Sequence, residues 1–272
     1  MEFSLLLSVY AKEKPEYLNK CLKSILESTV LPNEIVVVKD GPLTDELESV
    51  LKEYSAENKF FKIVALDKNV GLGKALNAGL TECSNELVAR MDTDDICMPT
   101  RFEIQLKEFD ANPSVSLVGG YITEFVDEET NIVSTRKVPT DFESLKKYSR
   151  KRNPVNHVTA MFKKSDIQAV GGYQKVKDVG YEDYDLWIRL IMADKKILNV
   201  DSIFVNVRVG KDMYKRRGNK KRLKTALFFR KKLWKMGYYG FLPFLFYSAQ
   251  TIAFAFVPSS VRKFLYKTIL RK

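Results

Sequence analysis

The sequence predicts an α/β fold: a mostly parallel sheet that helices cover on both faces. Two observations support this prediction. Short, strongly apolar runs alternate with helix-like segments through residues 3–91, and polar residues gather where the apolar runs end. Strands that are apolar along their whole length are typical of parallel sheets buried on both sides. The crossovers between such strands should be right-handed.

Taken in order, the elements alternate strictly. Strands are expected over residues 3–10, 34–39, 61–66 and 86–91, and the helices between them begin at Pro15, near Leu47 and at Gly71. Proline suits the first turn of a helix, and the apolar residues after Pro15 recur on one face. The carboxyl ends of parallel strands meet at one edge, where ligands bind beside the point at which the strand order reverses. Ser8, Tyr10, Asp40 and Asp92 should therefore share one pocket.

Three carboxylates follow the fourth strand, in the segment Asp92-Thr93-Asp94-Asp95. Carboxylates this close repel one another, and a divalent cation removes that cost. Mn²⁺ or Mg²⁺ prefers such oxygen ligands, and a diphosphate can complete its coordination shell. The alternative is an acidic turn, in which Asp95 or Thr93 caps a helix that begins near Thr100. The position after a fourth strand favours a metal-diphosphate site.

Two further segments at this edge are each open to two interpretations. Asp40 could accept a hydrogen bond from the imide of uracil while Tyr10 stacks on the base, or it could be a turn residue of Asp-Gly-Pro. In the segment Asn69–Gly79, Lys74 could reach a phosphate from a helix start, or the glycines could serve a tight loop. The spacing matches neither a dinucleotide motif nor a P-loop.

A second acidic group, Glu182, Asp183 and Asp185, begins a predicted buried helix. The helix dipole favours ionised carboxylates there, and one so held could act as a general base. Capping by Asp183 explains one of these acids but not all three. The single histidine, His157, is expected to be an ordinary hydrogen-bonded residue, with a metal or diphosphate contact as the alternative.

The C-terminal segment carries most of the charge. Residues 208–272 contain 18 of the 45 basic and one of the 34 acidic residues, a net charge of +17, which leaves −6 for residues 1–207. Its uncharged, aromatic stretch 238–257 favours an interfacial segment on an anionic membrane surface. The alternatives are a helical hairpin packed on the core, and nucleic-acid binding through the basic run Lys215–Arg222. The long apolar stretch favours lipid, so no nucleic acid is expected.

The remaining sequence features are negative. Cys21, Cys83 and Cys97 are scattered, which favours reduced structural thiols. The first strand begins without a basic leader segment, so we expect no signal peptide and a cytoplasmic core.

The ordered set of motifs resembles glycosyltransferase family 2, which has the GT-A fold. The likeness covers about residues 1–208. It is carried by Ser8-Val9-Tyr10, Val38-Lys39-Asp40-Gly41, Asn69-x-Gly71-Leu72 with Asn77-x-Gly79, Asp92-Thr93-Asp94-Asp95, His157, Gly171-Gly172-Tyr173 and Glu182-Asp183 followed by Asp185-Leu186-Trp187. It implies a metal-dependent, inverting transfer from a UDP-sugar to a glycan hydroxyl. The chain is most similar to bacterial enzymes that assemble capsule, exopolysaccharide or O-antigen on lipid-linked acceptors.

The resemblance also implies roles for individual residues. Asp183 would be the catalytic base, Asp40 would read uracil, and Mn²⁺ or Mg²⁺ would be the cofactor. The expected metal ligands are Asp92, Asp94 and Asp95, with His157 as a further possibility; the expected donor-binding residues are Ser8, Tyr10, Asp40, Asn69, Lys74 and Asp92; the expected acceptor-side residues are Gly172, Tyr173, Glu182 and Trp187. Lys39 departs from the family, where many members carry Asp. The Gln-x-x-Arg-Trp signature of processive synthases is missing, which predicts one sugar per encounter.

We therefore expect a GT-A catalytic domain over residues 1–207, with a nucleotide-sugar half at about 1–120 and an acceptor half at about 121–207. Residues 208–272 would form a basic, partly apolar helical extension that holds the enzyme on the inner face of the cell membrane. A nucleotidyltransferase would need a glycine- and arginine-rich loop in place of Ala11–Pro15. A non-enzymatic membrane or nucleic-acid adaptor would need neither Asp94 nor Asp183.

Overall fold

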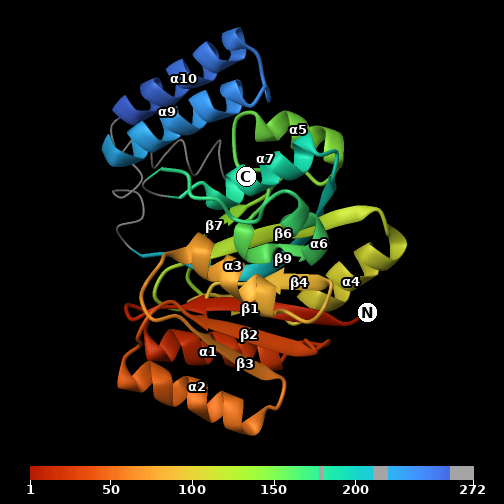
Figure 1. Ribbon diagram of the computed structural model, residues 1–272, viewed down its shortest axis with the longest axis vertical. Coiled ribbons are helices and arrows are strands. Elements are labelled where there is room, and N and C mark those ends of the chain that lie inside the picture. The colour runs from red at the N-terminus through yellow and green to blue at the C-terminus, as the bar shows by residue number, and fades with distance from the viewer. Residues whose placement is uncertain (178–179, 211–219, 258–272) are drawn as a thin grey trace.

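The computed structural model describes residues 1–177, 180–210 and 220–257, which form one mixed sheet with helices on both faces (Figure 1). The first half contains β1 (Phe3–Val9), α1 (Pro15–Leu26), β2 (Glu34–Lys39), α2 (Asp45–Glu57), β3 (Phe61–Ala65), α3 (Leu72–Glu82) and β4 (Leu87–Arg90). Every strand predicted in this half is present, and its ends differ from the prediction by at most one residue. The prediction of an α/β fold is confirmed.

The described strands lie in the order β3-β2-β1-β4-β8-β6-β9-β5, with β7 paired to β6. β1 pairs in parallel with β2 on one side and with β4 on the other. The chain adds β2 and then β3 on the first side, and afterwards crosses to the second side to add β4. This is the point where the strand order reverses, and it places the ends of β1, β2 and β4 at one edge. Such an edge is where α/β sheets bind ligands.

The second half adds antiparallel strands. It contains β5 (Ile96–Cys97), α4 (Arg101–Ala111), β6 (Val115–Phe125), β7 (Ile132–Arg136), α5 (Phe142–Ser149), the 3₁₀ turn η1 (His157–Thr159), β8 (Met161–Lys163), α6 (Lys164–Ala169), α7 (Glu182–Met192) and β9 (Lys196–Arg208). β8 runs antiparallel between β4 and β6, whereas β6 and β9 are parallel. The sheet is therefore parallel from β3 to β4 and mixed beyond it.

Two apolar cores lie on opposite faces of the sheet. Leu5 and Leu7 of β1 belong to the core that also contains residues of α1, α2 and α4. Leu6, which points the other way, packs in the core that contains Leu76 of α3 and Leu186 of α7. The alternation follows from the two-residue repeat of a strand. It explains why the strands are apolar throughout.

Two helices close the described chain, α9 (Lys220–Lys235) and α10 (Phe241–Phe256), and they lie side by side beyond α5 and α7 (Figure 1). Phe229, Leu233 and Tyr239 pack against Tyr184 and Ile188 of α7. The alternative prediction, a helical hairpin packed on the core, is therefore correct for the side of the hairpin that faces α7. On the outside, large apolar side chains stay exposed, namely Phe228, Phe241, Leu242, Leu245, Phe246, Ile252 and Phe256.

No helix within the described ranges is long and apolar enough to cross a membrane. Most of the basic run Lys215–Arg222 lies outside the described residues.

Gly79→Ala is expected to destabilise the protein by about 1–3 kcal/mol, the typical cost of overpacking a core. A Cβ at this position of α3 would lie 2.4 Å from Leu6 Cδ1 and 2.5 Å from Val38 Cγ2, so the helix must move off the sheet. Urea unfolding measures the change. Gly73→Ala in the same helix is the matched control, because its Cβ would approach Glu182 Cγ only to 3.4 Å. A neutral Gly79→Ala would contradict the prediction.

Candidate functional site

The three carboxylates that follow β4 form one cluster. The ligand oxygens of Asp92, Asp94 and Asp95 all lie within 4.8 Å of one another. Asp95 is buried, and its Oδ1 accepts a hydrogen bond from the backbone N–H of Arg208 at 2.9 Å. Helix α4 begins without a side-chain cap, so neither Asp95 nor Thr93 caps it. The capping role that the acidic-turn alternative gives to Asp95 or Thr93 is therefore wrong.

The cluster has the electrostatics of a cation site. Burial, with the charges of Asp92 and Glu13, raises the pKa of Asp94 to about 7. Burial and the two neighbouring carboxylates also raise the pKa of Asp95 well above its usual range. A divalent cation would relieve this repulsion, and carboxylate oxygens suit Mg²⁺ or Mn²⁺. His157 is not part of the group, and its role as a ligand stays a prediction.

Three contacts hold the acidic turn in place. Thr93 Oγ1 donates to Glu13 Oε2 at 2.8 Å, which ties the turn to the loop after β1. Arg208 donates from Nε to the carbonyl of Asp94 at 3.2 Å, and its guanidinium lies over the Tyr17 ring at 4.0 Å. Glu13 and Arg208 were not predicted, because each comes from a distant loop or strand end.

Asp40, at the end of β2, binds the loop before α3. Its Oδ1 and Oδ2 accept the backbone N–H groups of Val70 and Gly71 at 2.7 and 3.1 Å. Gly41 has φ +88°, and a Cβ there would lie 2.6 Å from Asn69 N, so the turn requires glycine. Each carboxylate oxygen keeps a further lone pair, so the prediction that Asp40 reads a base stays open.

The other predicted donor residues lie around the same edge. Tyr10 directly follows β1, and the residue is 44% exposed, as a side chain that stacks on a base requires. Ser8 is the penultimate residue of β1, whereas Asn69 and Lys74 are exposed on either side of the α3 start.

Asp183 lies in the first turn of α7, as predicted, and is held by one amide. Asn153 Nδ2 donates to its Oδ2 at 2.6 Å. Burial raises the pKa of Asp183, while the backbone N–H of Tyr184 and the Asn153 amide act in the opposite direction. A rigid carboxylate with a raised pKa is suited to general-base chemistry. The residue before this turn, Tyr181, has φ +73°, a left-handed conformation that is uncommon outside glycine.

Two of the predicted acceptor-side residues, Tyr173 and Trp187, contact His157. Its Nε2 forms a 2.9 Å hydrogen bond with the hydroxyl of Tyr173, and its ring lies 5.9 Å edge-on from Trp187. Trp187 is wholly buried, so it supports this wall of the site from behind. Gly172 has φ +62°, and a Cβ there would lie 2.7 Å from Asn77 Oδ1. Glu182 is half-buried beside the start of α3.

Arg90, the last residue of β4, connects the two sides of the site. It is 1% exposed and pairs with Asp92. Burial raises the pKa of Asp94 and Asp183, and the charge of Arg90 partly opposes this rise. Burial, together with the charge of Arg90, lowers the pKa of His157. Among the described residues the Nε and Nη1 of Arg90 find no hydrogen-bond acceptor. A buried cation therefore lies beside both acidic groups.

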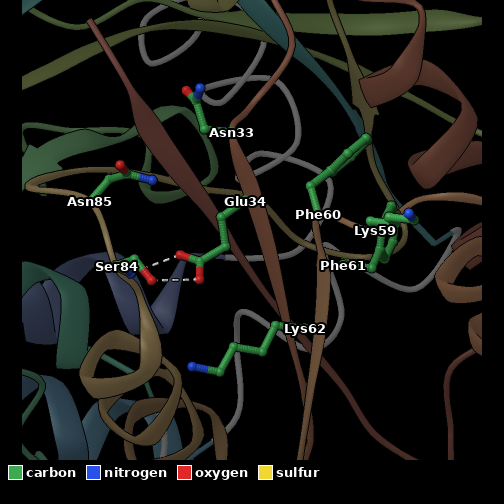
Figure 2. Close-up of a pocket in the computed structure, with 8 residues that line it drawn as sticks. All are labelled: Asn33, Glu34, Lys59, Phe60, Phe61, Lys62, Ser84 and Asn85. Atoms are coloured by element: carbon green, nitrogen blue, oxygen red, sulfur yellow. Dashed lines mark hydrogen bonds between the residues drawn. The ribbon is translucent and has the colours of Figure 1, made fainter.

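A hollow of about 430 Å³ lies at the opposite edge of the sheet. Figure 2 shows the residues that line it. Glu34 lies at its wall, and its carboxylate already accepts hydrogen bonds from Ser84 N and Oγ at 2.8 and 3.0 Å. Glu34 also accepts a hydrogen bond from the Ser4 hydroxyl at 2.6 Å. Because the Glu34 carboxylate is already hydrogen-bonded within the protein, we place the candidate site at the carboxyl ends of the strands instead.

Comparison with known proteins points to one family. Residues 4–170 match the model of "Glycosyl transferase family 2". The chain is 37% identical over 266 residues to the amylovoran biosynthesis glycosyltransferase AmsE of Erwinia amylovora, covering 97% of this chain and 98% of that protein. It is 34% identical over 271 residues to the UDP-Gal:alpha-D-GlcNAc-diphosphoundecaprenol beta-1,3-galactosyltransferase of Escherichia coli, covering 100% and 97%.

The fold also has a solved counterpart. The mannosyltransferase PcManGT from Pyrobaculum calidifontis, whose structure holds GDP-Man and Mn²⁺, superposes with a TM-score of 0.66 at 18% identity, covering 96% of this chain and 72% of that one. At this identity the likeness shows the GT-A fold alone.

Proposed function

The chain belongs to glycosyl transferase family 2 and is a glycosyltransferase of polysaccharide synthesis, and we propose that it moves one sugar, with inversion, from a UDP-sugar to a hydroxyl of a lipid-linked glycan. The observation that carries this proposal is the placement of two acidic groups around Arg90. The cluster Asp92–Asp95 suits a cation that binds a diphosphate, and Asp183 suits a base for the acceptor. The whole-length likeness to a galactosyltransferase whose name includes UDP-Gal supports the donor and acceptor classes.

The residues present fit a divalent metal and a diphosphate. Burial and the neighbouring charges of Asp92 and Glu13 raise the pKa of Asp94, and a divalent cation would relieve this repulsion. Asp92, Asp94 and Asp95 would hold Mn²⁺ or Mg²⁺, which when bound neutralises charge on the departing nucleotide. Tyr10 would stack on the base while Asp40 receives its imide N–H.

Asp183 then acts on the acceptor. Its carboxylate removes the proton of the attacking hydroxyl, and Asn153 fixes the direction of the carboxylate during this step. A single displacement at the anomeric carbon inverts its configuration. We assign Gly172 and Tyr173 to the acceptor side of the site, where the Tyr173 hydroxyl is hydrogen-bonded to His157.

A donor screen tests the proposal. Purified protein would be incubated with Mn²⁺, a lipid-linked acceptor and each common UDP- or GDP-sugar, and nucleotide diphosphate release would be followed with and without EDTA. Release from one UDP-sugar that EDTA abolishes is the expected result. Release from a GDP-sugar alone, or release insensitive to EDTA, would contradict the donor or the metal assignment. Absence of UDP-dependent thermal stabilisation would exclude the nucleotide site.

Asn153→Ala is expected to shift the acid limb of the rate profile to higher pH. Asp183 works only when ionised, so the rate falls as pH drops through its raised pKa. The Asn153 amide stabilises the ionised form, and removing it raises that pKa further. The dependence of kcat on pH with saturating donor measures the shift. If the acid limb does not shift in Asn153→Ala, a group other than Asp183 determines the pH dependence of kcat.

We also propose that the outer face of α10 binds an anionic membrane surface. In the cell this would be the inner surface of the cell membrane. The helix carries no charged residue, and α9 beside it carries eight basic and no acidic residues. Exposed apolar side chains next to basic ones are typical of interfacial helices.

Leu242→Glu with Phe246→Glu is expected to abolish binding to vesicles that contain phosphatidylglycerol, because both exposed side chains lie on one face of α10. Vesicle flotation measures binding. Leu31→Glu is the matched control, since Leu31 is 46% exposed on a loop of the nucleotide half. Unchanged flotation of the double variant would refute the membrane assignment.

A further inference from the structure

One face of α9 packs against the residues that flank Asp183. The Phe229 ring lies 5.0 Å from the ring of Tyr181 and 4.8 Å from that of Tyr184, centroid to centroid. Tyr184 also donates from its hydroxyl to the carbonyl of Ser149 at 2.5 Å. The backbone on both sides of the predicted base is therefore fixed by an aromatic contact with the C-terminal hairpin.

An ion pair joins the same two helices one turn further along. Asp185 is wholly buried between two cations: Arg189 Nε lies 2.9 Å from its Oδ2, and Lys232 of α9 pairs with Oδ1. Without Lys232, the buried Oδ1 would lose the partner that pairs with it, and an unpartnered buried acceptor is costly. Arg189 also donates to the carbonyl of Gly172 at 2.7 Å. Lys232 thus acts on α7 and, through Arg189, on the loop that carries Tyr173.

The hairpin also holds the hydrogen-bond partner of the base. Arg230 Nη1 and Nη2 donate to the carbonyls of Arg150 and Lys151, both at 2.7 Å. This turn leads directly into Asn153, whose amide donates to Asp183. Two neighbouring cations of α9 therefore fix the two segments whose relative position sets the direction of the Asp183 carboxylate.

We propose that α9 is a positioning element for Asp183, and that Lys232 and Arg230 are the positioning residues through which it acts. The proposal rests on the proposed function, because it takes Asp183 as the base. The predicted donor residues lie at the ends of β1, β2 and β4 and around the start of α3. Within the described structure none of them forms a hydrogen bond or ion pair with Arg230 or Lys232. Loss of either contact should slow transfer and leave donor binding unchanged. Because α10 packs on α9, binding of the α9–α10 hairpin to a membrane would also stabilise the position of α9 relative to Asp183.

Steady-state kinetics of Lys232→Met and Arg230→Met test the link. We expect each variant to lower kcat for transfer roughly 10-fold or more, since small displacements of a reacting group have effects of this order or larger. The KM for the donor and UDP-dependent thermal stabilisation should stay at wild-type values. Lys231→Met is the matched control: it lies between the two positions, removes the same charge, and is exposed. Lys232→Arg, which keeps the pair, should restore most of the rate.

Amide hydrogen exchange supplies a readout that does not need activity. In both variants the amides of 182–186 and 150–153 should exchange faster, while those of β1 and β4 stay protected. Arg230→Lys, which keeps the charge but offers one compact ammonium to two carbonyls, serves if the methionine variants do not fold. Folded variants with wild-type kcat and exchange would overturn the proposal. Faster exchange in a protein whose wild type transfers no sugar would instead refute the proposed function and leave the structural link intact.

Discussion

Asp183→Asn is expected to lower kcat for sugar transfer by about 10²–10⁴-fold, the range of general-base contributions. The substitution keeps the size of the side chain and an oxygen that can accept the Asn153 amide, which now lies 2.6 Å from Oδ2. It removes the negative charge and, with it, the ability to take a proton. Donor affinity, measured by UDP-dependent thermal stabilisation, should stay at the wild-type value because the donor residues lie on other elements.

The pH profile separates a base from a residue that only positions. The remaining activity of Asp183→Asn should lose the acid limb that the raised pKa of Asp183 gives the wild type. Asp194→Asn removes the same charge just beyond the other end of α7 and should leave rate and profile unchanged. A variant that retains turnover together with the acid limb would exclude Asp183 as the base.

The nucleotide half could be predicted from the sequence because its signals are local. Each strand of residues 3–90 is an apolar run, and Pro15 and the Asp40-Gly41 turn mark where elements begin and end. A parallel sheet then fixes which strand ends meet, so the gathering of Asp40 with the acids after β4 followed from topology. Arg90 could also have been recognised, since a charge inside an apolar strand is itself a signal.

The acceptor half could not be built in the same way. β6 pairs with β9, about 80 residues later, and its Gly120 is close-packed against Phe204, where a Cβ would lie 2.3 Å from Cδ2. The local sequence pattern of either strand does not predict which strand it pairs with. Asn153 shows the same limit at the site: its contact with Asp183 spans 30 residues, and a single asparagine after α5 has no periodicity or spacing to mark it.

Asp94→Asn is expected to lower metal-dependent transfer by about 10³-fold. Neutralising charge on the leaving group by a metal ion is worth several kcal/mol, and about 1.4 kcal/mol corresponds to a factor of ten in rate. The measurement is nucleotide diphosphate release at saturating Mn²⁺, beside Asp67→Asn as an exposed control at the end of β3. If Asp94→Asn keeps wild-type turnover, Asp94 is not a ligand of the catalytic metal.

The same variant makes a second prediction that needs no catalysis. Burial and neighbouring charges hold the pKa of Asp94 at about 7, well above its value in an unfolded chain, so ionised Asp94 destabilises the metal-free fold. The cost is absent at pH 4 and below, grows as pH rises, and is complete above about pH 7. In EDTA at pH 8, Asp94→Asn should therefore unfold at a higher temperature than the wild type, with the gain disappearing toward pH 4. Added Mn²⁺ should reverse the order, because the wild type alone then keeps all three carboxylates as ligands. A variant that is less stable in EDTA at pH 8 would mean that the three carboxylates do not repel one another, and the case for a cation at this cluster would fall with it.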